Sequence, residues 1–185
     1  TYLRKFVIIL TLGSFFSLIF YIPVAYKMLT LSVLDIGAMR ALINAGEHPF
    51  IQAGTLNALA KLFAFLYNIQ LVFFFINIIV EKKIRPFSWL ILLSSLSYVV
   101  YVLAFMGRDG FVFWLFSFVF TYLLFYNFIS KAIAVRLKKL FLIVTISFGF
   151  VFLSITIGRF VVGNDDNNAL IETLLSYMGQ GSINF

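Results

Sequence analysis

The stretch Phe6–Tyr26, FVIILTLGSFFSLIFYIPVAY, decides the fold, because it contains no Asp, Glu, Lys or Arg over a length that can cross a bilayer. A helix needs about 20 predominantly apolar residues for this. Four further stretches meet the same condition: 62–80, 86–106, 111–130 and 140–158. They are apolar on every face and do not alternate at every second position, which favours helices over the strands of a barrel. The sequence predicts an all-α integral membrane protein with about five transmembrane helices, forming a single transmembrane domain over 1–185.

The composition agrees with this prediction and excludes several function classes. Of the 185 residues, 63% are hydrophobic and 11% are charged, whereas soluble domains carry about 25% charged residues. The absence of Cys excludes thiolate catalysis and cysteine-ligated metals. His48 is the only histidine, so a histidine-ligated metal is not expected either. We therefore expect no metal and no cofactor.

The basic residues are distributed unevenly between alternate loops. The net charge of +7 does not indicate nucleic-acid binding, because the basic residues lie in short gaps between apolar runs. Nine of the 14 Lys and Arg residues lie before the first run or in 81–85 and 131–139, and five lie in the alternate loops. Because loops rich in Lys and Arg stay in the cytoplasm, the N-terminus and these two loops are predicted to be cytoplasmic.

The predicted outer face carries two longer segments, 34–58 and 165–185. In the first, Ile36, Met39 and Ile43 recur at helical spacing and Asp35 is placed to cap a helix. In the second, apolar residues between 169 and 178 gather on one side of a helix. Both segments are expected to contain amphipathic helices that lie in the membrane interface.

Three isolated arginines, Arg40, Arg108 and Arg159, fall on the same predicted outer face, each beside a membrane boundary. A guanidinium group stays charged and offers a planar fork of donors that matches the oxygens of a phosphate. The three arginines are therefore candidates for binding a diphosphate. Alternatively, each one extends to the lipid headgroups at its helix end, and Arg159 also complements the C-terminal dipole of its helix.

Arg108 has the clearest position of the three. It lies in Gly107-Arg108-Asp109-Gly110, the whole connection between two uncharged runs, where glycines permit a tight turn. The same residues also fit a simple polar hairpin turn at the interface. The candidate general bases on this face are Asp109 and His48, although a lone loop histidine is more often an exposed bystander. Within 62–80, Asn68, Gln70 and Asn77 are expected to hydrogen bond across helices.

These residues resemble the bacterial O-antigen and oligosaccharide repeat-unit polymerases, multi-span inner-membrane proteins in which a span ends in a Gly/Ser-Arg-x-Gly turn. The resemblance covers roughly residues 35–185. It includes 107–110, Arg159 and the segment 177–185, YMGQGSINF, which is similar to the start of a large periplasmic loop in that family. Because such polymerases usually have ten or more spans, the chain is expected to be a fragment of a longer protein.

The resemblance implies glycosyl transfer at the outer face of the bacterial inner membrane, with the N-terminus in the cytoplasm. A glycan would leave its polyprenyl-diphosphate carrier and join a hydroxyl of the next lipid-linked repeat unit. Arg108, Arg159 and Arg40 would bind the diphosphate, Asp109 or His48 would act as base, and a chain-length regulator is a possible partner. Three alternatives stay open: an O-antigen ligase, a flippase or other transporter of lipid-linked oligosaccharide, and a non-catalytic membrane subunit.

Overall fold

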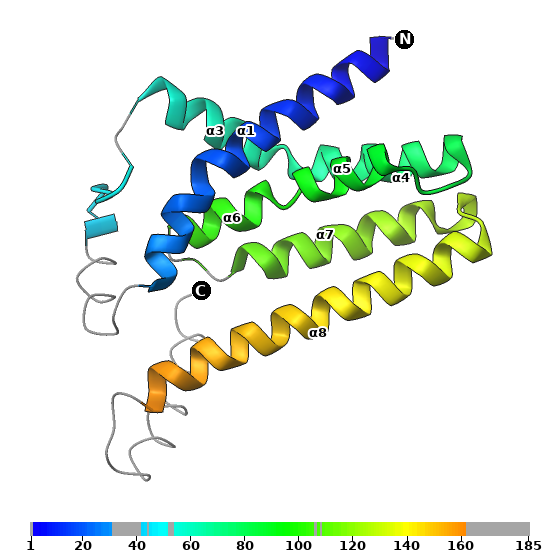
Figure 1. Ribbon diagram of the computed structural model, residues 1–185. Helices are drawn as coiled ribbons and strands as arrows, with labels where there is room; N and C mark the ends of the chain where they lie inside the picture. Colours follow the sequence, from blue (N-terminus) through cyan, green and yellow to red (C-terminus); the bar gives the residue numbers. More distant parts are fainter. Residues whose placement is uncertain are drawn as a thin grey trace. The chain divides into compact units, whose positions relative to one another are not determined.

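The computed structural model describes residues 2–30, 42–43, 45–51, 54–105, 107 and 109–161, without the side chains of 148 and 151–161. Every regular element in this part of the chain is a helix (Figure 1), which confirms the all-α prediction. The chain divides into two compact units, Thr1–Leu137 and Lys138–Phe185. The amphipathic helices predicted in 34–58 and 165–185 lie outside the described residues, except for 42–43, 45–51 and 54–58.

Helix α1, Tyr2–Thr30, begins before and ends after the predicted span 6–26 and continues through Pro23. At about 1.5 Å per residue it is roughly 43 Å long, more than the hydrocarbon thickness of about 30 Å. Its exposed face carries large apolar side chains such as Ile9, Leu12 and Ile19. Its buried residues recur every three or four positions and include four hydroxyl groups: Val7, Leu10, Thr11, Ser14, Ser17, Leu18, Tyr21, Val24, Ala25 and Met28.

The predicted span 62–80 is a pair of helices, α3 (Thr55–Phe65) and α4 (Tyr67–Glu81), bent by 46° at Leu66. The prediction of one uninterrupted helix was wrong here, and α3 begins inside the segment that was assigned to the interface. The bend leaves carbonyl groups at the end of α3 without helical partners. The Ser14 hydroxyl of α1 donates a hydrogen bond of 3.2 Å to one of them, the carbonyl of Phe63.

The predicted span 86–106 is also interrupted. Helix α5, Pro86–Ser94, is followed by α6, Ser97–Ala104, with the interruption at Ser95 and Leu96. The Ser95 hydroxyl donates to the carbonyl of Leu92 at 2.6 Å and accepts the indole N–H of Trp114 at 2.9 Å. Serine hydroxyls that bond to nearby carbonyls compete with the regular helical pattern, so the serine-rich stretch 94–97 is a natural place for the interruption.

The last elements are α7 (Asp109–Phe125), the short 3-10 helix η1 (Tyr126–Phe128) and α8 (Lys131–Val161). The helical part of the predicted span 111–130 ends with η1 at Phe128, before the predicted end at residue 130. The stretch 131–139 was predicted to be a loop, and this was wrong because it forms the first turns of α8. Its Lys, Arg, Ala and Leu residues are good helix formers, so the charged residues do not end the helix.

Among the described residues, three helical segments are long and apolar enough to cross a membrane: Tyr2–Thr30, Pro86–Ala104 and Asp109–Phe128, or four if the bent pair α3–α4 is counted as one span. Four of the five predicted spans therefore correspond to such segments. The fifth, 140–158, lies within α8 and is helical, and its role as a span stays a prediction.

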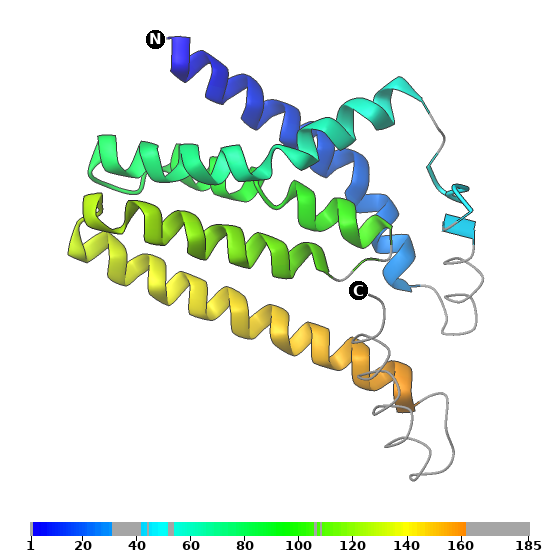
Figure 2. The same cartoon turned by 180° about the vertical axis from the view of Figure 1, so that it is seen from behind.

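The core of the first unit is held by polar as well as apolar contacts. Helix α1 packs mainly on α6 and crosses α3, as Figures 1 and 2 show from opposite sides. At the centre, the fully buried Gln70 of α4 donates to the Ser14 hydroxyl and accepts a hydrogen bond of 2.9 Å from Ser94. Asn77 donates to Ser88 at 2.8 Å. The predicted interhelical hydrogen bonds of Gln70 and Asn77 are confirmed.

Candidate functional site

The structure describes only part of the predicted site. Arg40 and Arg108 lie outside the described residues, and Arg159 lies on α8 with its side chain outside them. Asp109 and His48 are described with their side chains, and both lie in the first unit. The site is therefore built from these two residues and from the backbone and aromatic side chains around them.

His48 attaches the loop 45–51 to the end of α6. Its Nε2 atom lies 3.0 Å from the carbonyl oxygen of Ala104, the last residue of α6. The backbone N–H of Phe50 donates to His48 Nδ1 at 3.2 Å. Because Nδ1 accepts, the neutral ring carries its proton on Nε2 and donates it to Ala104. The ring also packs edge-on against Phe105, with centroids 4.8 Å apart.

Both nitrogen atoms of His48 are thus occupied in the neutral ring. A general base needs a free lone pair facing the proton that it removes. The observed hydrogen bonds give His48 a positioning role instead, because they hold a loop against the helix end that leads into residues 107–109. Removal of a substrate proton by His48 would first require the hydrogen bond from Phe50 to break.

Asp109 begins α7 and is exposed. A carboxylate at this position is stabilised by the N-terminal end of the helix dipole, which is one reason for an acid here. The same carboxylate lies within electrostatic range of the Tyr98 hydroxyl on α6. Since it is exposed and beside the connection that contains Arg108, Asp109 is the described acid best placed to accept a proton from a substrate.

The connection between α6 and α7 is packed too tightly for side chains at its glycines. A Cβ atom on Gly107 would lie 2.5 Å from a methyl group of Val102, and one on Gly110 would lie 2.6 Å from the Cβ of the same valine. The Gly107 N–H also donates to the Val102 carbonyl at 2.9 Å. Gly107 and Gly110 therefore lie close against Val102 of α6, and Asp109 lies between them in the sequence.

An aromatic cluster lies beneath this turn and was not predicted. Tyr21 of α1 packs edge-on against Tyr101 of α6 at 5.2 Å, and Tyr101 contacts both Phe65 and Phe105. The Tyr21 hydroxyl donates to Asn57 Oδ1 at 2.6 Å. The cluster could not be predicted from the sequence, because its members come from separate parts of a chain in which 19% of all residues are aromatic.

Two lysines accompany these aromatic residues. The Lys27 ammonium lies 5.2 Å from the ring centroid of Phe50, and the Lys61 ammonium lies 5.9 Å from that of Phe65. Both distances fit cation–π contacts. They add positive charge near the site that the sequence analysis assigned to arginines alone. Among the described residues, no group of three or more His, Cys, Asp or Glu side chains is arranged to hold a metal ion.

Comparisons with known proteins give no match: no family model, no curated protein and no solved structure is similar to this chain. The resemblance to repeat-unit polymerases therefore depends on the residues quoted above, and the site is characterised by its own geometry.

Proposed function

We propose that the chain is an integral membrane protein, and the distribution of polarity over the first unit supports this. Serine, threonine and glutamine side chains are buried between the helices, whereas large apolar side chains such as Phe116 and Phe120 are about 70% exposed, at 71% and 70%. In water this arrangement would be unfavourable. In hydrocarbon it is the expected one, because polar groups satisfy each other inside and apolar groups face the lipid.

The function that fits the site best is glycosyl transfer from a polyprenyl diphosphate to a sugar hydroxyl, at the membrane face where α6 ends and α7 begins. The observation that supports it most directly is the hydrogen bond between His48 and Ala104. It brings a loop from the first half of the chain to the connection that contains Arg108 and Asp109. This hydrogen bond joins the loop of His48 to the last residue of α6, five residues before Asp109 in the sequence.

The chemistry is divided among these residues as follows. Arg108 holds the diphosphate and stabilises the negative charge that develops on it, the role that the resemblance to the polymerases also implies for Arg159 and Arg40. The acceptor hydroxyl gives its proton to the Asp109 carboxylate while its oxygen attacks the anomeric carbon of the donor glycan. The bond between that carbon and the diphosphate oxygen breaks, and the carrier diphosphate leaves with the electron pair. His48 keeps the loop in place.

A transporter of the same lipid-linked substrate is the second candidate, because α3–α4 is bent at 46° and α5–α6 is interrupted. Discontinuous helices are typical of transporter binding sites. However, no charged side chain is buried among the described residues, and a path for an anionic substrate needs such groups. Glycosyl transfer is therefore preferred.

The first test is a surface-glycan gel from cells that lack the gene. A polymerase predicts glycans capped with a single repeat unit, and a ligase predicts full-length polymer that stays on the polyprenyl carrier. A transporter predicts single lipid-linked units confined to the cytoplasmic leaflet. An unchanged glycan profile would contradict the whole proposal and favour the non-catalytic subunit.

The same cells test the central arginine. Arg108→Ala is expected to abolish polymer while the protein remains inserted, and Arg108→Lys is expected to retain part of the activity, because lysine keeps the charge but loses the planar fork. Asp109→Asn should also abolish polymer. Arg4→Ala, at an exposed arginine in the first turn of α1, is the matched control and should leave polymer length unchanged. Normal polymer in the Arg108→Ala cells would remove this residue from the site.

A further inference from the structure

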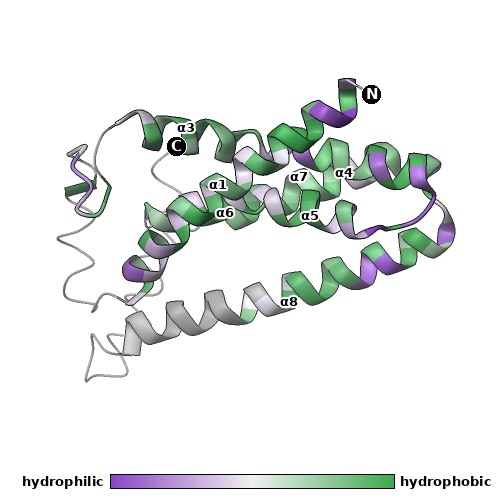
Figure 3. Cartoon of the chain, turned by 45° about the horizontal axis from the view of Figure 1, so that its top comes forward, coloured by the Kyte–Doolittle hydropathy of each residue, from purple (hydrophilic) through white to green (hydrophobic). Residues whose placement is uncertain are grey.

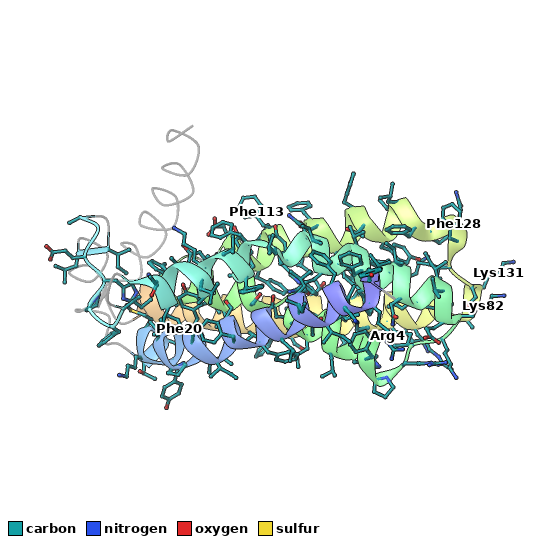
Figure 4. All side chains as sticks on the ribbon, turned by 90° about the horizontal axis from the view of Figure 1, so that it is seen from above. Arg4, Phe20, Lys82, Phe113, Phe128 and Lys131 are labelled. Atoms are coloured by element: carbon teal, nitrogen blue, oxygen red, sulfur yellow. The ribbon has the colours of Figure 1, made fainter. Side chains whose placement is uncertain are left out.

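One end of the first unit carries a concentration of exposed positive charge, and it is the end away from the candidate site. Lys82, Lys83 and Arg85 lie between α4 and α5, and Lys131 begins α8. Figure 4 shows Lys82 and Lys131 at the same end of the helices, and Figure 3 shows this end as a hydrophilic region next to apolar helix surface. These four residues are called the basic end.

The three lysines of the basic end are exposed. Helix α4 ends at Glu81, and Lys82, the residue after it, has a left-handed conformation with a φ angle of 52°. Arg85 forms a salt bridge of 2.6 Å with Glu81, so its charge is already balanced. Lys82, Lys83 and Lys131 are exposed and add positive charge beyond that pair.

The surroundings of the basic end indicate what kind of anion it meets. Trp89 in the first turns of α5 is 43% exposed, and Tyr126 and Phe128 of η1 are 48% and 69% exposed. Exposed aromatic rings next to lysines, at the end of long apolar helices, form the pattern of a membrane interface, with the rings at headgroup level. Binding of a soluble polyanion would not explain why these aromatic rings are exposed beside the lysines. The partner that fits both features is an anionic phospholipid headgroup.

The opposite end does not have this character. Its described charged residues are Lys27, Lys61, Glu47 and Asp109, so the two signs are balanced. Both lysines there lie over aromatic rings of the protein itself. A preference for anionic lipid is therefore expected at the basic end and not at this opposite end.

We propose that the basic end binds anionic phospholipids of the adjacent leaflet, with Lys82, Lys83 and Lys131 as the contacts to the phosphate groups. The lysines act as point charges near an anionic surface, where each is expected to change lipid partition about fivefold. This inference depends on the membrane placement in the proposed function and not on its glycosyl-transfer chemistry.

The test uses the full chain reconstituted in vesicles of phosphatidylcholine, alone or mixed equally with phosphatidylglycerol. The lipids retained on the purified protein are then counted by native mass spectrometry. The wild-type chain should retain phosphatidylglycerol in preference to phosphatidylcholine. Lys82→Gln/Lys131→Gln should lose this preference by tenfold or more, whereas the control Lys27→Gln/Lys61→Gln should keep it.

Four outcomes would overturn the inference. Equal retention of the two lipids by the wild-type chain, or equal loss of preference in both double variants, would exclude the basic end as a lipid site. Displacement of the phosphatidylglycerol by free glycerol phosphate would show recognition of phosphate alone and not of a membrane lipid. Failure of the chain to enter vesicles of either composition would also contradict the membrane placement in the proposed function. A chain that enters the vesicles but shows no lipid preference would contradict only the lipid site.

Discussion

At the scale of single residues, Gly110 of α7 and Gly149 of α8 differ in the free space around them. Alanine is therefore expected to have opposite effects on stability at the two positions. A Cβ on Gly110 would lie 2.6 Å from the Cβ of Val102, an atom close to the backbone of α6 that cannot rotate away. Gly110→Ala should therefore push α7 from α6 and destabilise the chain by about 1–3 kcal/mol. A Cβ on Gly149 in α8 meets nothing within 4 Å, so Gly149→Ala should stabilise its helix by about 0.5–1 kcal/mol.

The temperature of half-unfolding in detergent, measured by circular dichroism, checks both substitutions. A lower value for Gly110→Ala and an unchanged or higher value for Gly149→Ala are expected. If Gly110→Ala unfolds at the wild-type temperature, the close packing of Gly110 against Val102 does not contribute to the stability of the chain.

At the scale of helices, the hydrogen bonds of Gln70 connect the two interrupted spans to α1. Gln70→Leu removes the bonds to Ser14 and Ser94, but each serine keeps a backbone carbonyl as partner. With about 0.6 kcal/mol for each interhelical bond, the expected loss of stability is about 1 kcal/mol. Asn68 lies on the exposed face of the same helix, so Asn68→Leu should be neutral or stabilising in lipid. A van't Hoff analysis of thermal unfolding compares the two, and equal effects would contradict a bridging role for Gln70.

The same helices indicate what could be predicted from the sequence. The centres of the spans follow from long runs without charge, and four of them correspond to apolar helices. The bend at Leu66 could not be predicted, because no glycine or proline marks it and Ser14, from another helix, caps the freed carbonyl. His48 and Asp109 were named from the sequence, but the attachment of the His48 loop to the end of α6 was not predicted. His48 is held there by the backbone oxygen of Ala104, which has no sequence signature.

At the scale of the whole molecule, the basic end and the candidate site must face different sides of the membrane if the proposed function is correct. The chain contains no cysteine, so a single cysteine introduced at an exposed position reports its own accessibility. Glu47→Cys, beside His48, should react with a membrane-impermeant maleimide in intact spheroplasts. Lys83→Cys, at the basic end, should react only after the membrane is permeabilised, because positively charged loops stay in the cytoplasm. Labelling of Lys83→Cys from outside with protection of Glu47→Cys would invert the topology. The carrier diphosphate would then meet Asp109 in the cytoplasm, and polymerisation at the outer face would no longer be possible with this site.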